Sequence, residues 1–302
     1  MTTDKERLQA LRREIDAIDD SLHDLIMTRT MIVEKVRTVK RNDRIKIRPA
    51  REAEILYRLM ARHAGSFPKR ELARVWRELI VATLRLEGPF SVAVISAGED
   101  AQAHWDMARD QYGSFTPMTR HGSSRRVVER VRNGESTVGI LPLPRRDDDE
   151  QWWHLLVSEA PETPRIIARL PFIGAEGGRD TGAEALAICA VGQEETGRDR
   201  SFLAVEAEED IGFKAIEEAL TQVGFSAVFN QVWHEPTRPA AWSYLVEVFG
   251  FIDPERRQIP RVMEGLGSRV KRVVHLGGYA TPLGDTDLSQ DAGVPADEGT
   301  GS

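Results

Sequence analysis

The chain has 302 residues, of which 41% are hydrophobic and 29% charged, and its formal net charge is −7. This length and composition are typical of a globular protein of two or three domains, and the net acidity argues against general nucleic-acid binding. The sequence contains no run of about 18 apolar residues, so no membrane span is expected; the charged N-terminus lacks the apolar core of a secretory signal, so a cytoplasmic location is expected.

Three helices are predicted before residue 90. The first runs from residue 5 to about 41, where apolar residues recur at helical spacing without an intervening Gly or Pro. At about 1.5 Å per residue it is about 55 Å long, so it needs a partner along its length, most simply a second copy of itself. The second helix is predicted from about Arg51 to His63, and the third from Glu71 to Glu87, where a Gly-Pro pair follows.

Strands and helices alternate after residue 90, which suggests a parallel α/β unit that ends at the linker "GQEETGRDR". Four apolar segments are its predicted strands and two segments its helices: "SVAVISAG", "STVGILPLP", "PRIIARLPF", "EALAICAVG", Ala101–Tyr112 and Ser123–Asn133. Residues 201–282 then follow a βαββαβ pattern. Residues 284–302, rich in Gly, Asp and Ser, are expected to be disordered.

The cysteine and histidine content limits the disulfides and metal sites that the chain can form. Cys189 is the one cysteine, which excludes an internal disulfide and a cysteine-rich metal site. Because its neighbours are apolar, it is expected to be a packed, inert thiol. The seven histidines are scattered without metal-ligand spacing, so no metal is expected. Trp152 and Trp153, which follow an acidic run, are expected to pack locally.

Positive charge is concentrated in "RIKIRPAREAEIL", residues 44–56, where one helix ends and the next begins. On the first helix, Arg29 and Lys40 are eleven residues apart, so both point to one side, about 16 Å from each other along the axis. Two long side chains so placed can bracket one small anion. Arg12 lies about 25 Å further back and about 100° round, so it reaches that anion only from an antiparallel second copy. The spacing alone also fits ordinary surface cations on an amphipathic helix.

The stretches "LRREIDAIDDSLHDLIMTR", "VRTVK" and "RPAREAEIL" resemble the all-helical class of chorismate mutase over roughly residues 5 to 90. The resemblance implies that Arg12 crosses from the partner subunit to a substrate carboxylate and that Arg29 holds a carboxylate within the subunit. It also implies that Lys40 contacts a carboxylate and the breaking ether oxygen. Glu52 matches the glutamate that accepts a hydrogen bond from the substrate hydroxyl, and Arg51 matches the supporting arginine beside it.

The third helix supplies two further matches. Thr83 falls where the family has a small hydroxyl residue, and Glu87 falls where many members have Gln and some Glu, hydrogen bonding to the ether oxygen. Four residues make about one helical turn, so the two share a face. The aspartate that some members carry between Lys40 and Arg51 has no match here. Arg48 or Pro49 stands in that region.

The resemblance implies the rearrangement of chorismate to prephenate, which needs no nucleophile, metal or cofactor. The work is positioning a flexible dianion and stabilising the charge that grows on the ether oxygen. An ionised carboxylate cannot donate a hydrogen bond, so Glu87 has to be protonated to help. Two alternatives remain open: a lyase that releases pyruvate from isochorismate in the same pocket, and a non-catalytic regulator that binds aromatic metabolites.

The remaining residues resemble, in order, the start of a prephenate dehydratase domain and an ACT regulatory domain. The chain reads "PLPRRDDD" where the dehydratase family has an Asn-Ser pair, and "EALAICAV" lacks the threonine of its Thr-Arg-Phe motif, so this segment is expected to be an inactive relic. The segment "HEPTRP" keeps part of an ACT pattern, which implies an aromatic amino-acid effector; a purely structural role is equally open.

The expected fold is therefore multi-domain. An all-α three-helix domain, intertwined in a homodimer, covers residues 1–88, and a small degenerate dehydratase-like α/β domain covers 90–196. An ACT-like α+β domain covers 200–283, and a disordered tail covers 284–302.

Overall fold

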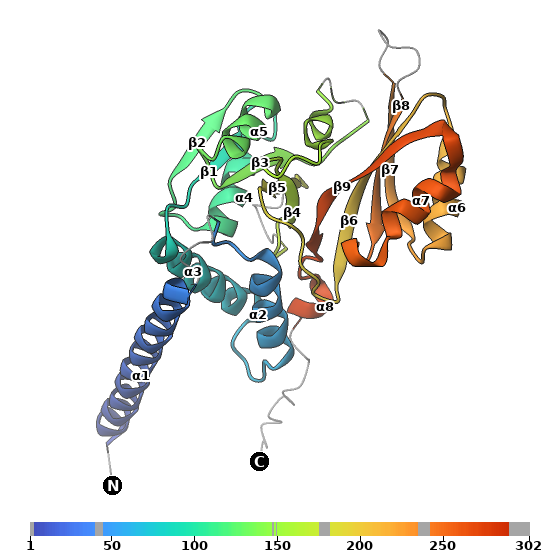
Figure 1. Ribbon diagram of the computed structural model, residues 1–302. Helices are drawn as coiled ribbons and strands as arrows, with labels where there is room; N and C mark the ends of the chain where they lie inside the picture. The colour runs from blue at the N-terminus through green and yellow to red at the C-terminus, as the bar shows by residue number, and fades with distance from the viewer. Residues whose placement is uncertain are drawn as a thin grey trace.

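The computed structural model describes residues 3–39, 45–146, 148, 150–174, 182–234 and 242–289. It places a helical region, up to residue 88, against one large sheet that carries the later helices (Figure 1). The chain is thus multi-domain, with an N-terminal helical domain followed by an α/β sheet region. Within the described part of the chain, no helix combines the length and the apolar character needed to cross a bilayer.

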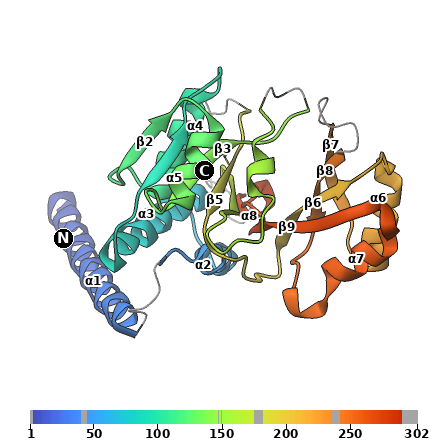
Figure 2. The ribbon, with the colours of Figure 1, turned by 45° about the horizontal axis from the view of Figure 1, so that its top comes forward.

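The three predicted helices are confirmed as α1 (Asp4–Val39), α2 (Pro49–Ala61) and α3 (Lys69–Glu87). Proline begins α2 because its fixed φ suits the first helical position, where no N–H bond is lost. The helices α2 and α3 pack on the sheet region, whereas α1 lies beside α3 and extends away from the sheet (Figures 1 and 2).

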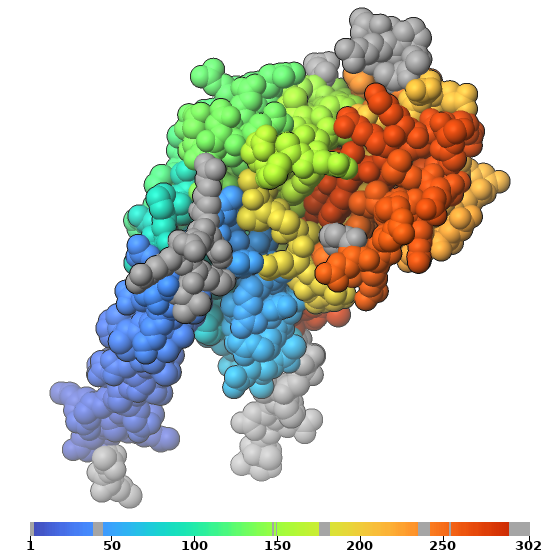
Figure 3. All heavy atoms as spheres, in the orientation of Figure 1, coloured from blue at the N-terminus to red at the C-terminus, as the bar shows by residue number. Residues whose placement is uncertain are grey.

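The protruding helix α1 leaves its apolar side chains in solvent, and Figure 3 shows it standing out from the body as a column. Ten large apolar residues of α1 are 40% to 65% exposed, and eight of them lie within about 120° around the helix. These eight are here called the α1 stripe: Leu8, Leu11, Ile15, Ile18, Leu22, Leu25, Ile32 and Val36. Met27 and Met31 lie on the other side of the helix. A soluble monomer rarely leaves so long an apolar surface open.

In the described part of the chain the sheet has nine strands, in the order β2-β1-β3-β5-β4-β9-β6-β8-β7. Their bounds are β1 Val92–Ile95, β2 Met118–His121, β3 Val138–Pro142, β4 Arg165–Leu170, β5 Ala185–Cys189, β6 Asp199–Ala207, β7 Ala227–His234, β8 Trp242–Phe249 and β9 Val270–Ala280. The pairs β1–β2, β1–β3 and β4–β9 are parallel, and the others are antiparallel. The parallel unit expected after residue 90 therefore holds for β1 to β3.

Helices cover the sheet in two groups. The first is α4 (Ala101–Tyr112) and α5 (Ser124–Arg132), which pack on β1 and β3, and the second is α6 (Gly212–Gln222) and α7 (Gln258–Leu266), which pack on the β6–β9 part (Figure 1). The predicted βαββαβ order of residues 201–282 is confirmed by β6, α6, β7, β8, α7 and β9.

The segments 90–196 and 200–283 contribute to one sheet. Strand β9 reaches β4 at the register Ile166–Gly277, and the Gly277 backbone has a φ of +103°. A Cβ atom there would lie 2.4 Å from the Ile166 carbonyl oxygen, so only glycine allows this approach. One hydrophobic cluster also spans both segments, from Val127 on α5 to Phe202 on β6.

Some local predictions are corrected or completed. Residues Asp285–Leu288 form a short helix, α8, where the tail was expected to be disordered from residue 284; its Asp287 carboxylate accepts two hydrogen bonds from Arg198 at 2.9 Å. A paired carboxylate ties this segment to the body. Trp152 and Trp153 are buried in a 3₁₀ turn, as expected for local packing. Cys189 is fully buried, and burial raises the pKa of its thiol to about 12, so it is an inert thiol.

Candidate active site

The C-terminal half of α3 carries two of the predicted site residues on one face. Thr83 is buried, and its hydroxyl donates to the Ile80 carbonyl oxygen at 2.7 Å, a bond within the helix. Glu87 is half-buried in the last turn of α3. The four-residue spacing that put them on one face in the sequence therefore holds in a continuous helix.

Helix α1 brings Arg29 to the region where it packs on α3. In that stretch Ile26, Arg29 and Val33 are half-buried, and the Arg37 guanidinium donates to the Leu86 carbonyl oxygen at 2.8 Å. Burial lowers the pKa of Arg29 from its ordinary value, although a guanidinium stays charged at any working pH. One fixed cation thus lies where α1 meets the helix that carries Thr83 and Glu87.

Of the other two predicted cations, Arg12 does not reach this group within one chain. Arg12 is exposed on the protruding part of α1, about 25 Å along the helix from Arg29. Lys40 lies outside the described residues. Only a second chain can bring an Arg12 side chain to the α1–α3 contact.

The two predicted site residues of α2, Arg51 and Glu52, differ in exposure and in their partners. Arg51 is exposed and pairs with Glu54 at 3.0 Å, whereas Glu52 is 6% exposed and pairs with Arg77 of α3 at 2.7 Å. Burial raises the pKa of Glu52, the Arg77 charge opposes that effect, and the negative charge of Glu87 adds to it. Glu52 therefore lies within electrostatic reach of Glu87, but its bonding partner is Arg77, about 120° round α3 from Thr83.

Sequence reasoning missed Arg77, although a signal was present. Arg77 follows Ala73 by four residues and precedes Ile80 by three and Leu84 by seven, which is the spacing of one helix face. Those three apolar residues are buried. A cation within a buried apolar face needs a counter-charge, and Glu52 is the carboxylate that the fold supplies.

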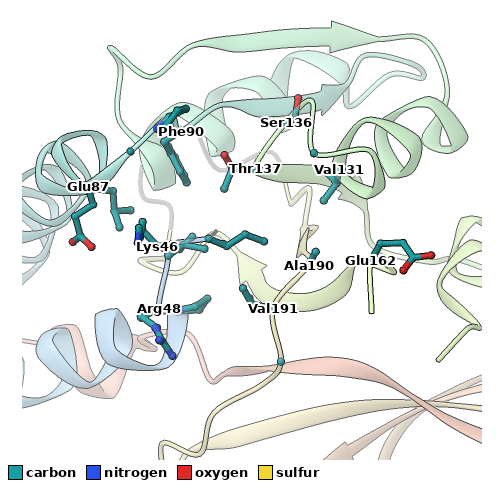
Figure 4. Close-up of a pocket in the computed structure, with 18 of the residues that line it drawn as sticks. Lys46, Arg48, Glu87, Phe90, Val131, Ser136, Thr137, Glu162, Ala190 and Val191 are labelled. Atoms are coloured by element: carbon teal, nitrogen blue, oxygen red, sulfur yellow. The ribbon is translucent and has the colours of Figure 1, made fainter. Parts of the chain in front are cut away.

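A cavity of about 1030 Å³ adjoins the end of α3 (Figure 4). Glu87, Lys46 and Arg48 line it on the helical side, and Ser136 and Thr137 line it on the sheet side. The segment 45–49 and the C-terminus of α3 thus form one wall of the cavity, and the sheet region forms the other.

The cations of the 45–49 segment lie at this cavity and not on a separate surface. Arg48 bridges its two walls by pairing with Glu194 at 2.5 Å. Lys46 and Arg48 therefore lie at the same cavity as Glu87, which Glu162 and Glu194 also line.

Residues 11–88 match the family model described as "Chorismate mutase type II". The N-terminal helical region is therefore a chorismate mutase domain of this type. The matched residues include all of α2 and α3, together with α1 from Leu11 onwards.

The curated relatives that match this chain are named as bifunctional chorismate mutase/prephenate dehydratases. The bifunctional chorismate mutase/prephenate dehydratase of Pseudomonas aeruginosa is 30% identical over 146 residues, which cover 46% of this chain and 40% of that protein. The protein of the same name from Aquifex aeolicus is 29% identical over 143 residues, which cover 46% of this chain and 39% of that protein. The chain thus spans about two fifths of the length of the curated relatives it matches.

Solved structures match this chain at low identity and with TM-scores below 0.5. The prephenate dehydratase of Arthrobacter aurescens in complex with L-Phe has a TM-score of 0.47 at 11% identity, covering 64% of this chain and 92% of that one. GqqA, described as a novel type of quorum quenching acylase, has a TM-score of 0.47 at 14% identity, covering 65% and 96%. Neither similarity is strong enough to define a function.

Proposed function

We propose that this chain rearranges chorismate to prephenate in aromatic amino-acid biosynthesis. The observation that carries the proposal is the match of residues 11–88 to the mutase family, in a helical domain where Arg29 lies at the α1–α3 contact and Thr83 and Glu87 share a face of α3. Arginine forks suit the two carboxylates of the substrate, and a donor at the ether oxygen stabilises the charge that grows there.

The working unit in this proposal is a homodimer. The α1 stripe is exposed along most of a helix about 54 Å long, so a second α1 running antiparallel would cover it. The same pairing delivers Arg12 of one chain towards Arg29 of the other. Each site then contains Arg12 from the partner copy, together with Arg29, Lys40, Arg51, Glu52, Thr83 and Glu87 from its own chain.

Two groups act on the breaking bond. Lys40 donates to the ether oxygen as a charged group, and Glu87 donates in its protonated form. Both interactions are stronger in the transition state than in the ground state, because negative charge on that oxygen grows as the carbon–oxygen bond breaks. The reaction needs no metal, cofactor or nucleophile.

The later part of the chain is proposed to be regulatory and inactive as a dehydratase. The β6–β9 part with α6 and α7 has the βαββαβ order of an ACT domain, and an aromatic amino acid is the proposed effector. The segment "HEPTRP", which suggested this effector, falls almost wholly outside the described residues. The segment "EALAICAV" includes β5, whose residues are all buried and whose side chains are apolar apart from the Cys189 thiol, which leaves no group there for proton transfer.

One experiment tests the proposal and its rivals. The purified full chain is incubated with chorismate and, separately, with isochorismate, and prephenate, phenylpyruvate and pyruvate are measured with and without phenylalanine or tyrosine. We expect prephenate from chorismate and no phenylpyruvate. Pyruvate from isochorismate without prephenate from chorismate would establish the lyase, and amino-acid binding without any turnover would establish the non-catalytic regulator.

A further inference from the structure

A buried ion pair joins α2 to α3. The Arg77 guanidinium donates through Nη1 to Oε2 of Glu52 at 2.7 Å, and the two side chains are 3% and 8% exposed. A buried pair of this kind is seldom kept for stability alone, because desolvating two charges costs about as much as their attraction returns. Since Glu52 is itself a proposed site residue, a role in function explains the pair better than stability does.

The two oxygens of Glu52 are used unequally. Oε2 is held by Arg77, whereas the buried Oε1 has no hydrogen-bond partner among the residues that the structure describes. An ionised carboxylate only accepts hydrogen bonds, so Oε1 needs a donor from elsewhere. The substrate hydroxyl, which the mutase resemblance assigns to Glu52, is such a donor.

The sheet region closes one side of the pair. The Phe172 ring lies under the Arg77 guanidinium at 5.3 Å, and Gln111 and Tyr112 border the same small void of about 10 Å³. A void of that size holds at most about one water molecule, so no substrate reaches Glu52 from this side. A ligand that reaches Glu52 therefore has to approach from outside this void.

We propose that Arg77 is a positioning residue of the mutase site: it fixes Glu52 by one oxygen, so that the other oxygen meets the substrate hydroxyl, and Phe172 of the sheet region holds Arg77 in place. This inference rests on the proposed mutase function. It means that the sheet region forms part of the support of the site.

The test exchanges the arginine fork for a point charge. Arg77→Lys keeps the positive charge but loses the planar fork, so Glu52 is neutralised without being oriented. We expect kcat/KM for chorismate to fall about 10- to 100-fold, the range for a reacting group displaced by about 1 Å. With a chorismate analogue that lacks the ring hydroxyl, the same variant should match the unmodified protein, because the contact that Arg77 orients is then missing.

Matched controls separate positioning from folding. Arg74→Lys makes the same exchange one turn earlier on α3, where the side chain is exposed and pairs with Asp110 at 3.2 Å, and should leave kcat/KM unchanged. Phe172→Leu should lower kcat/KM in the same direction as Arg77→Lys, whereas Phe115→Leu, at a residue 85% exposed, should not. Thermal denaturation of each variant reports whether it is folded at the assay temperature.

The double variant Glu52→Gln with Arg77→Gln covers the case in which the single variant unfolds. It removes both charges of the pair, so no unpaired ion stays buried. If Arg77 acts through Glu52, kcat/KM of the double variant equals that of Glu52→Gln alone. Equal losses on chorismate and on the hydroxyl-free analogue, or no loss in a folded Arg77→Lys protein, would overturn the inference while leaving the mutase function standing. An unmodified chain that does not turn over chorismate would overturn both.

Discussion

Replacing Ile18 by aspartate should separate the dimer that the α1 stripe implies. Ile18 is 59% exposed in the single chain and lies in the middle of the stripe. Full burial of an isoleucine side chain is worth about 1.5–3 kcal/mol, so covering the exposed share contributes about 1–2 kcal/mol per copy. In a two-fold dimer each substitution occurs twice, so the lost burial is about 2–3.5 kcal/mol.

That loss weakens the dimer about 30- to 400-fold, since about 1.4 kcal/mol corresponds to a factor of ten in the dissociation constant. The new carboxylate weakens it further, because the interface would have to desolvate a charge. The mutase rate should fall in parallel with the dimer, since the proposed site receives Arg12 from the partner copy. Sedimentation equilibrium over a range of protein concentrations measures the first effect, and initial rates at the same concentrations measure the second.

The control is Gln9→Asp, which adds the same carboxylate to α1. Nine residues separate Gln9 from Ile18, so the two lie about 180° apart, and Gln9 is exposed on the opposite face. This variant should remain dimeric and active. An unmodified protein that is monomeric and fully active at every concentration would refute the reasoning, as would an Ile18→Asp protein that keeps its partner and its rate.

Three further outcomes are expected. Glu87→Gln should flatten a mutase rate that otherwise falls as pH rises, because an amide donates at any pH; a pH–rate curve of unchanged shape would remove Glu87 from the ether oxygen. Lys40→Ala should lower kcat at least about 10²-fold, the scale for losing one such donor, and near-normal turnover would exclude this role. Burial and the nearby Arg165 charge lower the pKa of His275 from 6.5 to about 4, so its share of stability is present above pH 6.5 and is lost as pH falls towards 4. This shift corresponds to at most about 3 kcal/mol of the free energy of unfolding. Between pH 7 and pH 4.5 the melting temperature of the His275→Gln protein should therefore fall less than that of the unmodified protein. The melting temperature of the His23→Gln protein, changed at an exposed residue, should fall as much as that of the unmodified protein.

Most helices and strands were predictable because their patterns are local. The apolar spacing in α1, the proline before α2 and the Gly-Pro pair after α3 each fix an element within a few residues. Strand β2 was missed because "MTRH" has no buried residue: it is an edge strand that, among the described residues, pairs with β1 alone. Its existence depends on β1 offering a free edge, which a local pattern cannot reveal.

The residues of the proposed site came from the sequence, whereas the partners of their side chains came from the structure. Resemblance supplied Arg29, Thr83 and Glu87, and the structure puts Arg29 on the part of α1 that packs on the α3 helix carrying the other two. The pairing of Glu52 with Arg77 joins residues 25 apart on two helices. The contact of the Phe172 ring with Arg77 joins residues 95 apart in the sequence. Such contacts depend on how the sheet packs on α2 and α3.

The long-range contacts make the helical domain depend on the rest of the chain. Tyr57 of α2 donates to the Thr281 carbonyl oxygen after β9, and the Arg198 guanidinium lies over the Tyr57 ring at 4.3 Å. Arg198 is itself held by Asp287 of α8. The helix that carries Arg51 and Glu52 is therefore bonded to the end of the strand that spans the proposed regulatory part.

An effector that shifts β9 would thus act on α2 directly, without a path through the α1 dimer contact. The structure distinguishes two ways of changing the mutase rate. In the proposed dimer, loss of the α1 partner would remove Arg12 and make the rate depend on protein concentration. Displacement of α2 disturbs Glu52 in every chain and gives a change that dilution does not alter. Measuring the effect of phenylalanine at two protein concentrations separates these routes, and a response that is the same at both would assign the regulation to the contact between β9 and α2.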